Sequence, residues 1–212
     1  MTTEIMTIHE ALSELKVIGK RIEKELAGVK FVTTNKHCNT KIDGVDIKTY
    51  SDNVIAKYNK VVSLIKRRAA IKKAITFSNA NTVVDIAGTN MTIAEAIEYK
   101  VSGIDYKEKL LDSLVKSYDK AKYEIQSFNG EALSENATRY VERAYTNKDS
   151  VNKDVIENAR QKFIEDNTYD LIDPISADKE IQKLADEIDA FTSKVDSALS
   201  VSNATTKITI EY

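Results

Sequence analysis

The chain has 212 residues, and its single proline and six glycines leave long stretches uninterrupted, which favours long helices in a single domain over residues 1–212. It has no run of roughly 18 apolar residues that could span a membrane, no secretory-signal pattern at its start and one cysteine, Cys38, which excludes an internal disulfide, so we expect a cytoplasmic protein. The net charge of −2 combines 15 Lys and Arg against 8 Asp and Glu over residues 1–76 with 16 against 25 over residues 77–212, an imbalance that suits self-association more than nucleic-acid binding.

The first predicted helix covers about residues 8–27 and begins in a capping box. The Thr7 side chain can accept from the backbone N–H three residues on, and the Glu10 carboxylate can reach back to the N–H of the cap. Apolar residues recur along one stripe of this segment, and Gly28 ends it. The β-prone stretches of the chain predict β segments at about 30–34, 45–49, 82–87 and 205–211.

Further helices follow from apolar residues spaced three and four apart. They are predicted at about 52–76, 93–127, 151–166 and 177–201. The polar region 128–172 resembles an insertion between two long helices. The fold class we expect is mainly α: long antiparallel helices packed as a coiled-coil-like helical hairpin or bundle, with a small β-sheet or hairpins.

An internal repeat links these elements. Thr7-Ile8-His9-Glu10 returns as Thr92-Ile93-Ala94-Glu95, so Thr92 and Glu95 form a second predicted capping box. A second pair of matching segments, Ser78-Asn79-Ala80-Asn81-Thr82 and Ser202-Asn203-Ala204-Thr205-Thr206, lies where helices end and β segments begin. The chain therefore repeats a helix stop, a strand and a capped helix start.

The residues that usually carry chemistry are few and scattered. His9 stands where the repeat has an alanine, and no second cluster of His or Cys completes a zinc site with His37 and Cys38. Gly-rich phosphate-binding loops are absent from the sequence. We therefore predict no catalytic residue, metal or cofactor.

One basic run is the sharpest charge cluster in the sequence. Its cations either complement the carboxyl end of a helix or contact an anion, a nucleic acid or an acidic partner. If a ligand binds, we expect the asparagines of the two helix stops to assist. The candidate ligand-binding residues are Lys66, Arg67, Arg68, Lys72, Lys73, Asn79 and Asn203.

The repeated segments resemble a known family. Met6-Thr7-Ile8-His9-Glu10-Ala11-Leu12, the central Ser78–Thr82 and Met91–Ala96, and the final Asn203–Thr206 resemble the septicolysin-like family of small helical bacterial and phage-borne proteins. The resemblance implies a helical fold and a phage or mobile-element origin. It implies no catalytic activity, and this chain carries extra material near residues 29–50 and 128–172.

The function we expect is that of a non-enzymatic structural or assembly protein that associates with itself. Its heptad-like seams and unlike halves favour a homo-oligomer, and other assembly proteins are possible partners. A phage origin would place it in the cytoplasm or the virion. The alternative is a binding module for a small anionic ligand or nucleotide, and a membrane or nucleic-acid partner is not expected.

Overall fold

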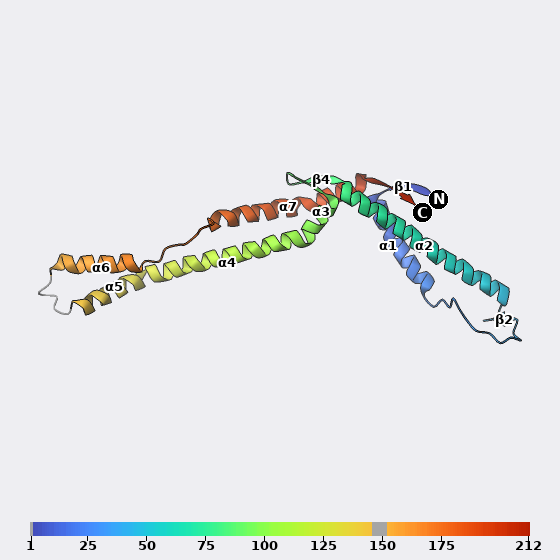
Figure 1. The fold of residues 1–212 in the computed structure, drawn as a ribbon, viewed down its shortest axis with the longest axis horizontal. Helices are drawn as coiled ribbons and strands as arrows, with labels where there is room; N and C mark the ends of the chain where they lie inside the picture. Colours follow the sequence, from blue (N-terminus) through green and yellow to red (C-terminus); the bar gives the residue numbers. More distant parts are fainter. Residues whose placement is uncertain (1, 146–151) are drawn as a thin grey trace. The chain divides into compact units, whose positions relative to one another are not determined.

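The computed structural model describes residues 2–145 and 152–212 (Figure 1). The protein is mainly α-helical with small antiparallel strand pairs, which confirms the expected fold class. In chain order its elements are β1 Thr3–Thr7, α1 Ile8–Leu26, β2 Lys41–Ile42, β3 Val45–Asp46, α2 Ile47–Asn81, β4 Val83–Ile86, β5 Thr89–Thr92, α3 Ile93–Glu98, the π-helical turn η1 Tyr99–Gly103, α4 Ile104–Asn129, α5 Glu131–Ala144, α6 Lys153–Asn167, α7 Ala177–Thr205 and β6 Lys207–Glu211.

Contacts divide the chain into two compact units. The first comprises Met1–Val101 and Phe191–Tyr212, and the second comprises Ser102–Ala190. The boundaries fall within η1 and within α7. Each unit has its own set of internal contacts, and the single domain expected over residues 1–212 stays a prediction.

The chain contains two copies of a strand–helical hairpin–strand arrangement. The first copy runs from β1 through α1 and α2 to β4, and the second runs from β5 through α3 and α7 to β6. The strands pair between copies, β1 with β6 and β4 with β5, and Thr7 faces Lys207 in the same register as Thr92 faces Val83. Equivalent residues lie 85 positions apart at the first strand and 124 at the second, so the second hairpin is 39 residues longer.

The capping boxes are present at both helix starts, as the sequence predicts. The Glu10 N–H donates to Thr7 Oγ1 at 3.2 Å, and the Glu95 N–H donates to Thr92 Oγ1 at 3.2 Å. In return, the two glutamates accept from the cap N–H groups at 2.8 and 2.7 Å. These bonds lower the pKa of both glutamates, because a carboxylate that accepts backbone N–H donors favours its charged form.

The helix stops are equally alike in the two copies. The Thr82 N–H donates to the Ser78 carbonyl at 2.8 Å, and the Thr206 N–H donates to the Ser202 carbonyl at 2.8 Å. The next bond crosses between copies: the Thr206 carbonyl accepts from the Ile8 N–H at 3.0 Å, and the Thr82 carbonyl accepts from the Ile93 N–H at 2.9 Å. Each stop is thus tied to the capped start of the other copy's hairpin.

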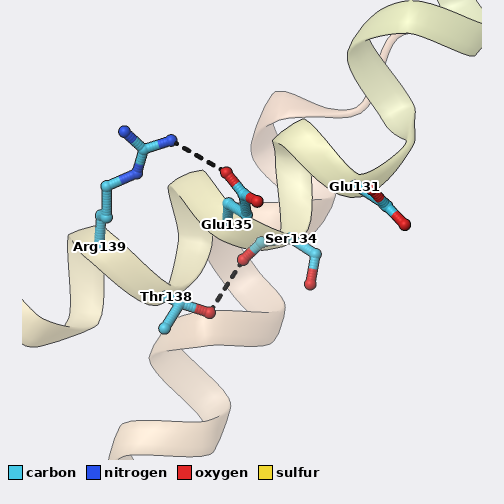
Figure 2. A pocket seen from close by; sticks show the side chains of 5 residues that line it. All are labelled: Glu131, Ser134, Glu135, Thr138 and Arg139. Atoms are coloured by element: carbon cyan, nitrogen blue, oxygen red, sulfur yellow. Dashed lines mark hydrogen bonds and ion pairs between the residues drawn. The ribbon is translucent and has the colours of Figure 1, made fainter.

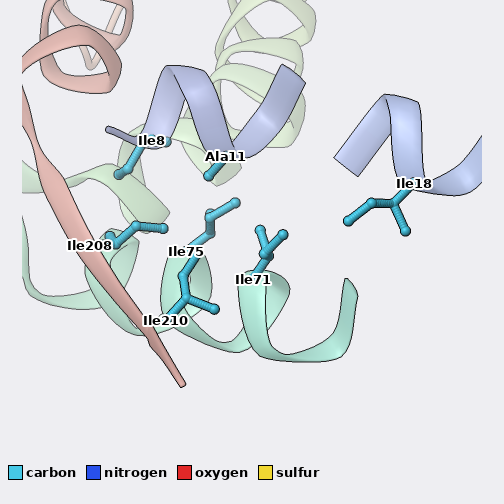
Figure 3. Packing of buried hydrophobic residues seen from close by; sticks show 7 residues of the cluster. All are labelled: Ile8, Ala11, Ile18, Ile71, Ile75, Ile208 and Ile210. Atoms are coloured by element: carbon cyan, nitrogen blue, oxygen red, sulfur yellow. The ribbon is translucent and has the colours of Figure 1, made fainter. Parts of the chain in front are cut away.

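An isoleucine-rich cluster forms the core of the first unit (Figure 3). It joins α1, α2 and β6 through Ile8, Ala11, Ile18, Ile71, Ile75, Ile208 and Ile210. Ile8, Ala11 and Ile71 of the first copy correspond to Ile93, Ala96 and Val195 of the second, and Ile210 of the second copy corresponds to Ile86 of the first; all of these residues are buried. The duplication therefore conserves the buried pattern as well as the caps.

The second unit contains α4, the α5–α6 hairpin and the beginning of α7. Tyr140 of α5 stacks on Phe163 of α6 with ring centroids 4.8 Å apart. At the end of α4, the Asn129 side chain donates to the Tyr169 carbonyl at 2.7 Å and accepts from the Tyr169 N–H at 2.8 Å. These bonds fix the segment that follows α6.

Two predicted β segments differ in the structure. Residues 30–34 form no strand, since Val32 is 89% exposed and no neighbouring strand pairs with this stretch in the part of the chain that the structure describes. Of the segment 45–49, only Val45–Asp46 is a strand. Asp46 accepts a hydrogen bond from the Lys48 N–H at 3.0 Å and starts α2 there.

The observed helices differ from the predicted ones mainly in where they begin and end. The one expected at 52–76 starts earlier and ends later, and the one expected at 93–127 is interrupted by η1. Residue 151, the expected start of a further helix, lies outside the described residues. Four elements escaped prediction, β1, β2, β5 and α5, because the strands are short and the region of α5 is polar.

Candidate interaction surface

One flank of the antiparallel α1–α2 hairpin is closed by ion pairs. Lys60 of α2 lies 2.6 Å from the Glu25 carboxylate of α1. Two turns further along α2, Arg67 pairs with Glu14 of α1 and Glu4 of β1. This flank therefore satisfies its own charges.

Arg67 joins four parts of the first unit, and we call this cluster the Arg67 clasp. Its guanidinium donates to Glu4 at 2.7 and 3.0 Å, to Glu14, and to the hydroxyl of Tyr212, which in turn donates to Glu4 at 2.8 Å. Hydrogen bonds from Arg67 and then from Tyr212 lower the pKa of Glu4 to about 2, and the bond to Glu4 raises the pKa of Tyr212. The pKa of Arg67 itself is raised by its two carboxylate partners. The Arg67 clasp therefore connects parts of the first unit, and the charge of its guanidinium is already paired with carboxylates of the same chain.

The second copy fills the corresponding place with aromatic rings. Phe191 corresponds to Arg67 and Tyr99 corresponds to Glu14. Their rings meet edge to face, with centroids 4.7 Å apart. An ionic cluster in one copy and an aromatic pair in the other thus hold equivalent helix positions together, which argues against a chemical role for the Arg67 clasp.

The opposite flank of the α1–α2 hairpin is apolar and exposed. In an antiparallel helix pair, residues that directly follow the core positions of both helices lie on one side. On α1 these include Leu12 and Leu26, which are 38% and 46% exposed. On α2, Ile55, Tyr58 and Ile65 form a stripe of side chains that are 50–57% exposed. We call these five residues the open face.

The open face was not predicted, although the sequence contains its signal. Val62 and Ala69 continue the α2 stripe, so its apolar positions alternate three and four apart over about 21 Å. On α1, Gly19 lies between the two leucines, and a Cβ added there would meet nothing within 4 Å. Both helices therefore carry a second apolar seam besides the one that packs in the core.

The seven candidate ligand-binding residues do not converge on one pocket. Asn79 and Asn203 occupy equivalent positions at the ends of two different helices, and Asn79 lies about 20 Å along α2 from Lys66. Apart from Arg67, the cations of the run are exposed and have no ion-pair partner among residues 2–145 and 152–212; they are Lys66, Arg68, Lys72 and Lys73.

Two surface pockets are further places where a ligand could bind. Figure 2 shows one on α5, where every lining residue belongs to the same helix; Arg139 pairs with Glu135 at 3.4 Å, and the Thr138 hydroxyl donates to the Ser134 carbonyl at 2.9 Å. The other, of about 560 Å³, lies between the loop after α1 and the start of α2. Phe31, Tyr50, Lys30, Lys57 and Asp43 are among the residues that line it.

The described residues contain no group of three or more His, Cys, Asp and Glu side chains placed to hold a metal ion. The cysteine, Cys38, is exposed and free. Among the helices that the structure describes, none combines the length and apolar character needed to cross a membrane. No protein-family model, curated protein or solved structure matches the chain.

Proposed function

We propose that the protein is a non-enzymatic structural protein that assembles with copies of itself through its helical surfaces. The observation that carries this proposal is the open face. Exposed apolar patches of this kind on helices mark contact surfaces, because their burial against a partner is favourable at roughly 25 cal/mol per Å². The unlike charges of the two halves of the sequence support association between copies.

The proposal includes the finer expectations that follow from it. A homo-oligomer of this kind belongs in the cytoplasm or, if phage-encoded, in the virion. Membership of the septicolysin-like family, suggested by the repeated cap and stop segments, would agree with both. Other assembly proteins are further candidate partners.

Analytical ultracentrifugation over a wide concentration range tests the proposal. We expect the wild-type chain to associate as its concentration rises, and a variant with Tyr58→Gln and Ile65→Gln to associate less. Val17→Gln is the matched control, because Val17 is 47% exposed but lies on the ion-paired side of α1. A wild-type chain that stays monomeric throughout would contradict the proposal.

A second candidate function is binding of a small anionic ligand or nucleotide. The four exposed cations of the basic run, which have no ion-pair partner in the part of the chain that the structure describes, favour it. A ligand that binds only the folded state raises the melting temperature by mass action. Thermal-shift measurements with nucleotides should then show a rise that Lys72→Gln with Lys73→Gln removes, and no rise with any nucleotide would contradict this function.

A further inference from the structure

Cations that have no ion-pair partner among residues 2–145 and 152–212 predominate around the open face. On α2 these are Lys66, Arg68 and Lys72, and on α1 the exposed Lys16 lies on the same side together with one carboxylate, Glu23. Helix α2 as a whole holds eight Lys and Arg residues against one Asp. On the ion-paired flank, such charges are neutralised by glutamates of α1 and β1. What binds the open face should therefore be both apolar and acidic.

The second unit presents a segment with the complementary character. Residues 165–178 contain five Asp and Glu residues and no Lys or Arg. Within them, four apolar side chains are exposed: Tyr169 at 51%, Leu171 at 40%, Ile172 at 85% and Ile175 at 54%. We call residues 169–175 the acidic segment.

The acidic segment is held in a defined conformation. Asn129 bonds the backbone of Tyr169 in both directions, and Phe128 stacks on the Tyr169 ring with centroids 4.6 Å apart. At its other end, the Asp173 carboxylate accepts from the Ala177 N–H at 2.8 Å and caps α7. A segment ordered in advance loses less entropy on binding. Its exposed isoleucines are therefore presented to a partner at low cost.

We propose that the open face of one copy binds the acidic segment of a second copy, an inference that rests on the proposed self-association. The sizes agree, since seven residues span at most about 23 Å and the apolar stripe of α2 is about 21 Å long. The open face contributes Ile55, Tyr58 and Ile65 between its cations. The acidic segment contributes Leu171, Ile172 and Ile175 beside Asp170.

This pairing joins two different surfaces, so it is a heterologous contact. A dimer formed in this way still has one unoccupied open face and one unoccupied acidic segment, so association continues into chains or rings. A contact between two open faces would instead end at a dimer. It would also bring cations together, so that it would strengthen with salt, whereas the proposed contact weakens as salt screens unlike charges.

A mixing experiment with two full-length variants tests the inference. The face variant carries Tyr58→Gln and Ile65→Gln, and the segment variant carries Asp170→Asn and Ile172→Gln. All four side chains are exposed, so circular dichroism spectra and melting temperatures should match those of the wild type. We expect each variant alone to stay monomeric and the equimolar mixture to form a dimer and nothing larger, since only one productive contact remains.

The outcomes separate this inference from the proposed function. A wild-type chain that never associates overturns both. If the wild type associates but the segment variant associates equally well, or if the mixture forms no dimer, the head-to-tail contact is wrong and self-association stands. Association of the wild type that strengthens from about 0.05 M to about 1 M salt, as the Debye length shrinks to about 3 Å, also overturns the inference.

Discussion

Replacing Ile71 by alanine should destabilise the first unit far more than the same change at Ile65 on the same helix. Ile71 is fully buried in the isoleucine cluster between α1, α2 and β6, whereas Ile65 is 50% exposed on the open face. Both substitutions remove the same three carbon atoms. The comparison therefore isolates the effect of burial.

The magnitudes follow from the two environments. Three buried carbons at about 0.8 kcal/mol each give roughly 2.4 kcal/mol for Ile71, and the cavity left behind adds about 1 kcal/mol. For Ile65, half of the side chain is already in water and no closed cavity forms, so the loss is about 1 kcal/mol. The two variants should differ by about 2.5 kcal/mol.

Urea unfolding followed by circular dichroism measures this difference. The samples should be dilute, so that association through the open face does not contribute. With a slope of about 2 kcal/mol/M, Ile71→Ala should lower the midpoint by about 1.7 M and Ile65→Ala by about 0.5 M. Equal shifts would show that the isoleucine cluster is not the core of this unit.

Three further changes address the clasp, the caps and the turn. Glu4 has a pKa of about 2 in the folded chain against an ordinary 4.5, so the stability that its carboxylate contributes to the first unit is fully present above pH 4.5 and is lost as the pH falls toward 2. Glu4→Gln should reduce this dependence on pH in hydrogen-exchange measurements on α2. Thr7→Ala should cost about 1 kcal/mol in urea unfolding and Thr7→Ser much less, since serine retains the cap; equal losses would contradict the capping role. Ala87 and Gly88 have φ of 55° and 84°, as in a type I′ turn. Ala87→Asn should therefore stabilise the folded state by roughly 0.5–1 kcal/mol and raise the melting temperature, because asparagine adopts this left-handed conformation more readily than alanine. A lower melting temperature would contradict that turn type.

Local signals predicted the two capped helix starts of this protein well. Thr7 and Glu10, and again Thr92 and Glu95, act within three residues of one another, so their sequence spacing contains all the information that the box requires. Strand pairing is different, because β1 finds its partner at the other end of the chain. Nothing in a five-residue stretch of Thr, Glu, Ile and Met indicates that partner.

The interaction surface shows the same limit. The basic run suggested one ligand-binding set, but Arg67 forms an ion pair with Glu4 and a hydrogen bond to the hydroxyl of Tyr212, which lie 63 and 145 residues away. The sequence does not reveal such a distant partner. The open face, by contrast, follows from the seven-residue recurrence of apolar residues on α1 and α2, and it would have been found by testing each helix for a second seam.

The pairing of β1 with β6 makes the chain nearly a closed ring. The Thr2 N–H donates to the Tyr212 carbonyl at 3.0 Å, and the Tyr212 N–H returns to the Thr2 carbonyl at 3.3 Å. At the corresponding place in the other strand pair, the two-residue turn Ala87–Gly88 joins β4 to β5. A circular permutant that links the present termini with a short turn and opens the chain at Gly88 would therefore exchange the roles of the two strand pairs, and the order in which the hairpins are synthesised would be reversed.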